Sequence, residues 1–357
     1  MRIVYVAHVN DLATSGVVSK IAGQTEEWRR QGHDARLLLL TRDRGQREAR
    51  LPDARVFSYG GPVSRMQALA RLVRAARRLQ PSIVYVRKDL FYPQLLALPR
   101  SAGLVLEINE DDLVEYRLGS RRRFEYNRLT RGILLRRARG LVFVTSELQR
   151  SPSFAGHRMP SIVVSNGMRL GDYPEVPAPA NPRPRLVFVG TSGQVWQGVD
   201  KVVTLAALEP GWDVDVIGAR AEDMADSAAT VPNVTWHGPL DHASALRVMA
   251  GADVGIGTLA LHRKAMHEAG ALKLREYLAL GLPVIYGNED ADVDAIPELT
   301  LRIPNTETNV TTDIQRIESF VEAARGRRIP RAALAHLDTE AKEARRLAFL
   351  RTVAGQP

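Results

Sequence analysis

The sequence contains no cysteine and no long apolar run, and both absences restrict its class. Without cysteine, disulfide bonds, thiolate chemistry and the disulfide-rich secreted proteins are excluded. No apolar run approaches the about 20 residues that span a bilayer, and the run within residues 1–10 is too short for a signal peptide. We therefore expect a cytoplasmic protein. Histidine and carboxylate residues form no cluster with metal-ligand spacing, so no metal site is predicted.

Lysine is scarce, and the positive charge is unevenly distributed. Only 6 of the 49 basic residues are lysine. Residues 1–170 contain 30 basic and 15 acidic residues, a net of +15, and the remainder contains 19 and 25, a net of −6, which together give the formal charge of +9. Such asymmetry can indicate an anionic membrane or an acidic partner. The excess of arginine is equally typical of a GC-rich gene.

Two basic helices, expected over residues 64–79 and 121–139, could hold the protein at an anionic membrane, as basic amphipathic helices do. They could equally be solvated helix faces. No helix-turn-helix, RNA-binding sheet motif or zinc finger accompanies the charge, so we expect no nucleic-acid partner.

The length and the element pattern predict two α/β domains. A chain of 357 residues fits two domains of about 150–180 residues each. Strands alternate with helices over residues 1–172, and the pattern restarts at residue 185, which predicts a parallel sheet covered on both faces in each half. Residues 174–184 contain five prolines, so we place a stiff linker over 173–184. An apolar periodicity over 333–353 predicts a terminal amphipathic helix.

The most informative stretch contains two glutamates eight positions apart, Glu268 and Glu276. A turn of small residues lies between them, and an apolar helix, a Gly-x-Pro stop and a strand follow. One carboxylate is therefore expected at a loop tip and the other on the helix, with the helix N-terminus between them. Helix N-termini bind phosphate, and carboxylates accept hydrogen bonds from diols. A ligand with a sugar, a diphosphate and a ribose would suit this arrangement, although a bare Glu-x7-Glu is common by chance.

The neighbouring motifs resemble those of the glycosyltransferase family 4 group of GT-B enzymes. The matching stretches of the second half are Val189-Gly190 with 196–200, 237–240, 252–257, and Glu268-x7-Glu276 with 277–285. In the first half, residues 163–167 resemble the strand before the family's domain crossover, and residues 16–20 resemble its glycine loop. The resemblance covers nearly the whole chain.

The resemblance implies a GT-B fold of the α/β class, with two Rossmann-like doubly wound domains facing a central cleft. Residues 1–172 would bind the acceptor and residues 185–335 the nucleotide-sugar donor. A C-terminal helix of about 336–357 would cross back to the N-terminal domain. The implied activity is that of a retaining hexosyl- or related transferase which uses a nucleotide-diphosphate sugar as co-substrate and needs neither metal nor cofactor.

The resemblance also implies roles for individual residues. Glu268 would contact the hydroxyls of the donor sugar and serve catalysis, and Glu276 would bind the ribose. The diphosphate would be cradled at the helix start by Ala269, Gly270, Ala271, Leu272 and Lys273. The donor sugar and diphosphate would also be contacted by Gly16, Thr191, Gln197 and Lys264, and the nucleobase pocket would be lined by Gly218, His237 and Gly238.

Two departures from the family pattern concern the diphosphate. The family usually has an arginine and a lysine where this chain has Thr191 and Gln197. The missing charge could come from one of four cations, Lys201, Arg263, Lys264 or Lys273. For Lys273, a contact with phosphate and a solvated helix face are both open.

A third departure lies in the N-terminal half. Many family members have a histidine near the end of the fourth or fifth strand, and here Asn109 and Glu110 follow a strand instead. Asn109 or Glu110 could replace that histidine, or the acidic cluster could cap a helix. His8 ends the first strand, and we expect it at the acceptor or donor.

The acceptor would be a small molecule, a glycan or a lipid-linked sugar, and the positive charge of residues 1–170 favours a phosphorylated, carboxylated or membrane-borne one. Two alternatives remain. One keeps the fold but changes the reaction, to that of an epimerase, a phosphorylase or a pseudo-glycosyltransferase. The other is a non-catalytic protein that binds nucleotide sugars or associates with membranes.

Overall fold

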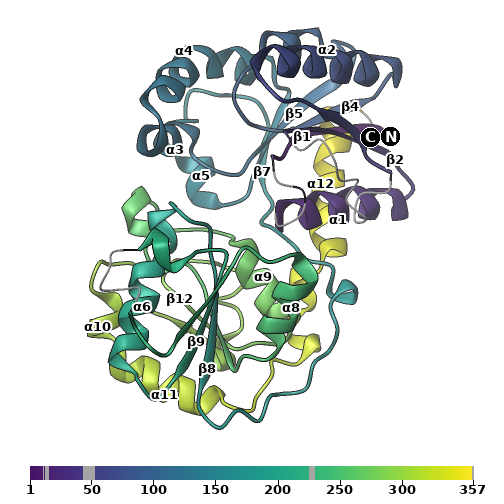
Figure 1. Ribbon diagram of the computed structural model, residues 1–357. Helices are drawn as coiled ribbons and strands as arrows, with labels where there is room; N and C mark the ends of the chain where they lie inside the picture. Colours follow the sequence, from purple (N-terminus) through teal and green to yellow (C-terminus); the bar gives the residue numbers. More distant parts are fainter. Residues whose placement is uncertain (11, 13–15, 43–52, 225–229, 356–357) are drawn as a thin grey trace. The chain divides into compact units, whose positions relative to one another are not determined.

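The computed structural model describes residues 1–10, 12, 16–42, 53–224 and 230–355. The chain divides into two compact units, which are shown in Figure 1. Unit 1 comprises Met1–Gly167 with Thr339–Pro357, and unit 2 comprises Met168–Asp338. The proline-rich segment 173–184 therefore belongs to unit 2.

Unit 1 contains a parallel sheet in the order β3-β2-β1-β4-β5-β6-β7. Its strands are β1 (Arg2–His8), β2 (Asp34–Thr41), β3 (Arg55–Ser58), β4 (Ile83–Arg87), β5 (Gly103–Ile108), β6 (Gly140–Phe143) and β7 (Ser161–Val163). The central strands are buried along nearly their whole length, which is typical of a parallel sheet covered on both faces. The short strand β3 was not predicted.

The helices of unit 1 are α1 (Gly16–Arg30), α2 (Pro62–Arg78), η1 (Pro93–Ala97), α3 (Asp112–Gly119), α4 (Arg121–Arg137), α5 (Ser146–Arg150) and α12 (Thr339–Val353). Proline begins α2, where its missing N–H matters least. Asp111 caps α3 by accepting hydrogen bonds from the N–H groups of Leu113 and Val114.

The terminal helix is shorter than predicted. The periodicity over 333–353 predicts one helix, but the structure has a 3-10 helix, η7 (Arg331–Leu337), followed by α12. The two are separated at Asp338, whose backbone is extended, and the carbonyl of Leu337 accepts a hydrogen bond from the N–H of Met168. The one-helix prediction is wrong because η7 completes unit 2 and α12 belongs to unit 1.

Helix α12 is held against the rest of unit 1 by apolar contacts and a buried hydrogen bond to α1. It lies beside α1, as Figure 1 shows. Glycine at positions 103 and 140 makes room for Val353, which a Cβ atom at either position would crowd. Glu343 accepts a 2.7 Å hydrogen bond from the indole N–H of Trp28 and forms a salt bridge with Arg346. Both charged side chains are almost completely buried.

Unit 2 contains a second parallel sheet, in the order β10-β9-β8-β11-β12-β13. Its strands are β8 (Arg185–Val189), β9 (Asp213–Ile217), β10 (Val234–Gly238), β11 (Val254–Ile256), β12 (Val284–Tyr286) and β13 (Thr300–Arg302). Its α-helices are α6 (Val199–Leu208), α8 (His242–Ala250), α9 (Leu272–Ala279), α10 (Asn309–Thr312) and α11 (Ile314–Ala324), and its shorter 3-10 turns are η2 (Leu170–Asp172), η3 (Val195–Gln197), η4 (Ala221–Asp223), η5 (Leu261–Lys264) and η6 (Pro297–Leu299).

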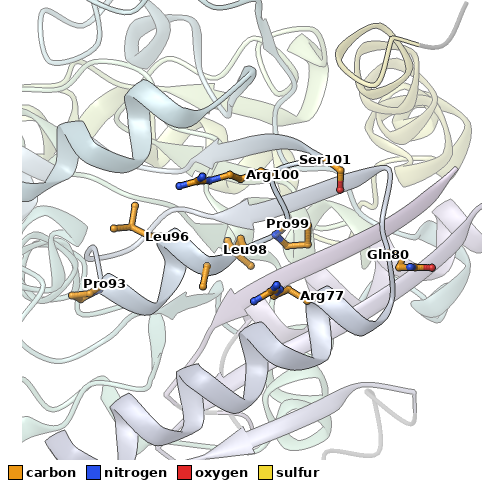
Figure 2. A pocket seen from close by; sticks show the side chains of 9 residues that line it. Arg77, Gln80, Pro93, Leu96, Leu98, Pro99, Arg100 and Ser101 are labelled. Atoms are coloured by element: carbon orange, nitrogen blue, oxygen red, sulfur yellow. The ribbon is translucent and has the colours of Figure 1, made fainter.

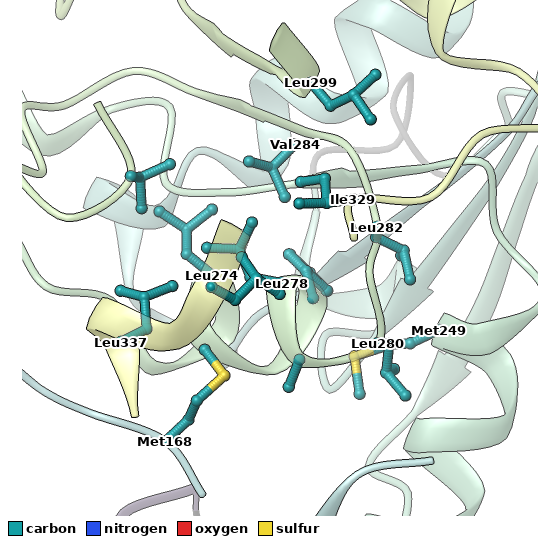
Figure 3. Packing of buried hydrophobic residues seen from close by; sticks show 14 of the residues in the cluster. Met168, Met249, Leu274, Leu278, Leu280, Leu282, Val284, Leu299, Ile329 and Leu337 are labelled. Atoms are coloured by element: carbon teal, nitrogen blue, oxygen red, sulfur yellow. The ribbon is translucent and has the colours of Figure 1, made fainter. Parts of the chain in front are cut away.

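Helix α9 lies in the middle of one of the apolar clusters of unit 2. Figure 3 shows its residues Leu274 and Leu278 among the buried side chains. Met168 and Leu337, from the two ends of unit 2, belong to the same cluster. The side of α9 that carries the leucines is thus fixed in the core, which determines where its remaining side chains point.

We predict that Glu343→Ala destabilises unit 1 by about 3–5 kcal/mol, because it leaves the buried guanidinium of Arg346 and the indole N–H of Trp28 without their partner. Urea unfolding followed by tryptophan fluorescence measures the change. Glu340→Ala, at an exposed position of the same helix, is the control and should change stability by at most about 0.5 kcal/mol. Equal midpoints for the two variants would contradict this account of α12.

Candidate functional site

Glycines at the carboxyl edge of the unit 2 sheet allow neighbouring backbone segments to approach one another closely. Gly190 follows β8 and Gly218 follows β9. Gly218 has φ of +90°, and a Cβ atom there would overlap the carbonyl oxygen of Gly190. Its N–H donates to the carbonyl of Gly238, at the end of β10. The predicted positions Gly218 and Gly238 are therefore brought together with Gly190, at the edge where open α/β sheets bind ligands.

The loop with the first glutamate is anchored to the segment after β12. Glu268 forms a β-bridge with Glu289, and the N–H of Ala269 donates a 3.0 Å hydrogen bond to the carbonyl of Glu289. The side-chain amide of Asn288 donates to the carbonyl of Ala269. The N–H of Ala269, which was predicted to cradle a diphosphate, is thus already used in this bridge.

Helix α9 begins directly after this loop, with Ala271 as its extended N-cap residue. The N–H groups of Leu272 and Lys273 belong to the first turn, so they have no acceptor within the helix. No acidic residue lies in this turn, and the positive end of the helix dipole is not neutralised there. This end of α9 has the chemistry of an anion site.

Buried contacts fix the position of α9. Arg275 is only 1% exposed and forms a two-pronged ion pair with Asp290, at 2.8 and 2.9 Å. The buried hydroxyl of Tyr277 accepts a 2.7 Å hydrogen bond from the N–H of Val189 at the end of β8. Gly255 leaves room for the Tyr277 ring, which a Cβ atom would overlap.

The second glutamate, Glu276, points to α8. Its Oε1 lies 3.8 Å from Nδ1 of His242, and its side chain is 14% exposed. A carboxylate that is partly buried and still open to solvent can accept hydrogen bonds from a ligand. Glu268 is also partly buried.

Lys273 lies next to Thr191 and Gln197, the two positions where the family usually has a cation. Its ammonium is 3.1 Å from Oε1 of Gln197 and 4.1 Å above the ring of Phe188. The same oxygen of Gln197 accepts a 3.2 Å hydrogen bond from the N–H of Thr191. Burial lowers the pKa of Lys273 to about 7. Of the two possibilities left open for Lys273, the solvated helix face does not fit this surrounding.

The other three candidate cations have partners within unit 2. Arg263 pairs with Asp200 at 2.7 Å, and it also pairs with Glu307. The ammonium of Lys201 donates a 3.0 Å hydrogen bond to Asn309. The ammonium of Lys264 lies 4.2 Å from the centroid of the Trp196 ring, as in a cation–π pair. These contacts hold the loops that lead to α6 and α9.

His237, which was predicted to line the nucleobase pocket, contacts a residue of the neighbouring strand. Its Nε2 lies 2.7 Å from Asp215, and the same carboxylate accepts two hydrogen bonds from Arg185. The strand register shifts between Trp236 and Gly238, which places His237 in a bulge.

In unit 1, the predicted His8 forms a polar cluster at the carboxyl edge of the sheet. Its Nδ1 lies 2.5 Å from a carboxylate oxygen of Asp89, which follows β4, and its Nε2 is 2.8 Å from the hydroxyl of Tyr59. Burial by itself would raise the pKa of Asp89, but hydrogen bonds from His8 and Tyr116 lower it to about 2. Asp89 and the tyrosines were missed because segments far apart in the sequence supply them.

Asn109 lies in a different part of this edge. It accepts a 2.7 Å hydrogen bond from Lys20, which also pairs with the fully buried Glu107 at 2.7 Å. Burial lowers the pKa of Lys20 to about 8, against the opposing effect of Glu107. Lys20 lies on α1, the helix that Gly16 begins.

Two of the three acidic residues that follow Asn109 serve the fold, in agreement with the capping alternative. Asp111 caps α3, and Asp112 pairs with Lys88 at 2.6 Å and with Arg131 at 2.8 Å. Asp112 is therefore matched by two cations.

Two neighbouring cavities of unit 1 lie at the opposite edge of the sheet. One of about 780 Å³ is lined by residues that precede β4 and β5, among them Gln80 and Ser101, together with Arg77 and Arg100 (Figure 2). It does not coincide with His8 or Asn109. Within the described residues, no group of three or more histidine or carboxylate side chains could hold a metal ion. No described helix is long and apolar enough to cross a membrane, and the membrane contact stays a prediction.

Comparisons with known proteins agree with this architecture. Residues 15–167 match the family model of the glycosyl transferase 4-like domain. The fold is similar to that of a sucrose-phosphate synthase from Thermosynechococcus elongatus, with 16% identity, a TM-score of 0.73, and coverage of 99% of this chain and 100% of that one. It is also similar to Anabaena HepE in complex with UDP-glucose, with 14% identity, a TM-score of 0.67 and coverage of 99% and 100%.

A third similar structure is AviGT4, a glycosyltransferase of avilamycin A biosynthesis, with 15% identity, a TM-score of 0.66 and coverage of 99% and 98%. No curated protein matches the sequence. Together with the two parallel sheets, these findings confirm the predicted GT-B fold of two Rossmann-like domains and the family 4-like resemblance.

We predict that Gly218→Ala destabilises unit 2 by about 3 kcal/mol or more. The free-energy cost of a left-handed backbone at alanine adds to the cost of the overlap with Gly190. Gly193→Ala is the matched control: its φ is +78°, but a Cβ atom there meets nothing within 4 Å. This control should lose about 1–2 kcal/mol. Urea unfolding midpoints measure both, and equal losses would show that the close approach of the two backbones is unimportant.

Proposed function

We propose that this family 4-like GT-B protein is a retaining glycosyltransferase. Unit 2 would bind a nucleotide-diphosphate sugar, and the sugar would pass to an acceptor bound by unit 1 without a metal ion. The observation that carries the proposal is the start of α9, where Lys273 and first-turn amides without an acceptor in the helix lie between Glu268 and Glu276. The similarity to HepE, which binds UDP-glucose, agrees with a nucleotide-sugar donor.

The diphosphate would lie at the N-terminus of α9. The N–H groups of Leu272 and Lys273 and the helix dipole favour an anion there. The ammonium of Lys273 would supply the positive charge that Thr191 and Gln197 lack. Glu276 would accept hydrogen bonds from the ribose hydroxyls, and Glu268 would accept them from the donor sugar.

The reaction would be a front-face displacement. The bond between the anomeric carbon and the diphosphate oxygen breaks, and a bond from the acceptor oxygen to the same face of that carbon forms. The acceptor proton passes to the departing phosphate oxygen. Negative charge develops on the diphosphate in the transition state, so donors fixed at this position lower the barrier. Because the helix start and Lys273 provide that charge stabilisation, the proposal requires no divalent cation.

A non-catalytic nucleotide-sugar-binding protein is the second candidate, and the uncharged Thr191 and Gln197 favour it. The same fold could also serve an epimerase, a phosphorylase or a pseudo-glycosyltransferase. Slow hydrolysis of the donor separates these possibilities, because a transferase releases sugar to water when no acceptor is present. Binding of nucleotide sugars without any turnover would leave the non-catalytic candidate.

We predict that one of UDP, GDP, ADP and dTDP raises the melting temperature most, because ligand binding to the folded state stabilises it. Glu276→Ala should weaken that nucleotide about 10- to 100-fold, since hydrogen bonds to a charged group contribute about 1.5–3 kcal/mol. Glu268→Ala should abolish transfer from the corresponding nucleotide sugar. Glu298→Ala, an exposed glutamate of unit 2, is the control. Wild-type affinity and rate in both site variants would refute the assignment.

We further predict that the protein takes up a proton when it binds the diphosphate. With a pKa of about 7, Lys273 is largely neutral at pH 8 in the free protein, and an adjacent diphosphate favours its charged form. Calorimetric titration at pH 8 in buffers of different ionisation enthalpy measures the uptake. It should approach one proton at pH 8 and fall at pH 6, where Lys273 is already protonated.

Two variants control this measurement. Lys273→Arg keeps a charge that does not titrate, so it should bind the nucleotide without proton uptake. Lys273→Met should bind more weakly and also without uptake. Undiminished uptake in both variants would assign the proton to another group and remove Lys273 from the proposed diphosphate site.

A further inference from the structure

The side chain of Arg65 in unit 1 has the geometry of an anion-binding group. The guanidinium of Arg65, in the first turns of α2, lies 4.6 Å from the centroid of the Tyr59 ring and 5.8 Å from that of Tyr92. It also donates a 2.8 Å hydrogen bond to the hydroxyl of Tyr92. Stacking between two rings fixes the planar fork of an arginine, so little entropy is lost when the fork binds a ligand.

Among the described residues no carboxylate forms a salt bridge with Arg65, in contrast to the buried arginines that hold the fold together. Arg131 pairs with Asp112 and Arg275 pairs with Asp290. The Nε of Arg65, by contrast, is buried without any hydrogen-bond partner in the described part of the chain. A buried donor without an acceptor is unfavourable, and such groups are rare unless a ligand or ion satisfies them.

The surroundings of Arg65 favour a negative ligand. Arg65 lies near the N-terminus of α2, whose first turn contains no acidic residue, so the helix dipole adds to the positive potential. The nearby carboxylate of Asp89 is occupied on both oxygens, by His8 at 2.5 Å and by the hydroxyl of Tyr116 at 2.9 Å.

Tyr59 joins the arginine to a polar group that can bind a hydroxyl. Its ring lies against Arg65, and its hydroxyl lies 2.8 Å from Nε2 of His8 and donates a 2.9 Å hydrogen bond to Asn10. Because the carboxylate of Asp89 can only accept, it orients His8 with Nδ1 as the donor and Nε2 turned to Asn10. Asn10 is exposed, so a ligand hydroxyl can reach it.

We propose that this cluster binds an acceptor sugar or polyol that carries a phosphate or carboxylate group, with Arg65 paired to the anion and Asn10 and His8 bonded to a neighbouring hydroxyl. The fork of an arginine fits phosphate and carboxylate alike. The inference rests on the proposed function in taking the bound molecule to be the acceptor. The anion site itself does not depend on transfer.

The first experiment is calorimetric titration of the full chain with four probes: glucose 6-phosphate, glucuronate, glucose and inorganic phosphate. We expect at least one of the two anionic sugars to bind at least tenfold more tightly than glucose and inorganic phosphate. Only an anionic sugar offers both an anion for Arg65 and a hydroxyl for Asn10 and His8. The two anionic sugars distinguish a phosphate from a carboxylate acceptor. Equal affinity for glucose and both anionic sugars would overturn the proposal.

Variants test whether Arg65 is responsible. Arg65→Gln should weaken the preferred anionic sugar at least tenfold, and Arg65→Lys should give an intermediate affinity, because it keeps the charge but loses the fork. Arg71→Gln removes the same charge from an exposed position of the same helix and should bind as the wild type does. An equal loss in the Arg65→Gln and Arg71→Gln variants would show only a general field effect and would contradict the site.

Transfer assays separate this inference from the proposed function. With a donor that the wild type hydrolyses, Arg65→Gln should raise the KM for an anionic acceptor at least tenfold relative to the KM for its neutral counterpart. An unchanged ratio, with donor hydrolysis intact in the wild type, refutes the inference and leaves the proposed function standing. Arg65-dependent binding of an anionic sugar by a protein that turns over no donor refutes the proposed function and leaves the anion site standing.

Discussion

The buried ion pair between Arg275 and Asp290 is the contact on which the proposed donor site depends. Both side chains are almost fully buried, and their two parallel hydrogen bonds fix the rotation of α9 and the path of the segment after β12 together. That segment then forms the bridge that holds the loop of Glu268. The orientations of Glu268, Lys273 and Glu276 therefore depend on this charged contact together with the packing of the α9 leucines and the bond between Tyr277 and the end of β8.

The same rotation of α9 accounts for the unusual position of Lys273. A lysine at a partly buried helix start loses hydration, which lowers its pKa, but the ring of Phe188 and the oxygen of Gln197 keep its amine in place. In the proposed site, one lysine on a helix would take the place of two cations on the loops after β8. The proposed grip on the diphosphate is then charged mainly when the ligand is present, which couples binding to protonation.

Unit 1 uses buried charges in two different ways. In the pairs of Lys20 with Glu107 and of Glu343 with Arg346, each charge meets its opposite within the fold. The first pair attaches α1 to the sheet, and the second lies within α12, where Glu343 also accepts a hydrogen bond from Trp28 of α1. Arg65 is held by two tyrosine rings, and in the described part of the chain its Nε has no hydrogen-bond partner and no carboxylate forms a salt bridge with it. Rigid placement of this kind is what a preorganised ligand-binding group requires.

The sequence by itself determined the α/β class, the restart of the pattern at residue 185, and the motif of Glu268 and Glu276, because periodicity and helix stop signals act over a few residues. It left open whether Lys273 faces solvent, and it missed Asp89, Tyr59 and Arg65. Those answers depend on which strand ends are neighbours. The sheet order puts β1 beside β4, and thereby His8 beside Asp89, although 81 positions separate them. Only the tertiary structure decides such contacts, because the chain pairs its strands through long-range packing and not through local preference.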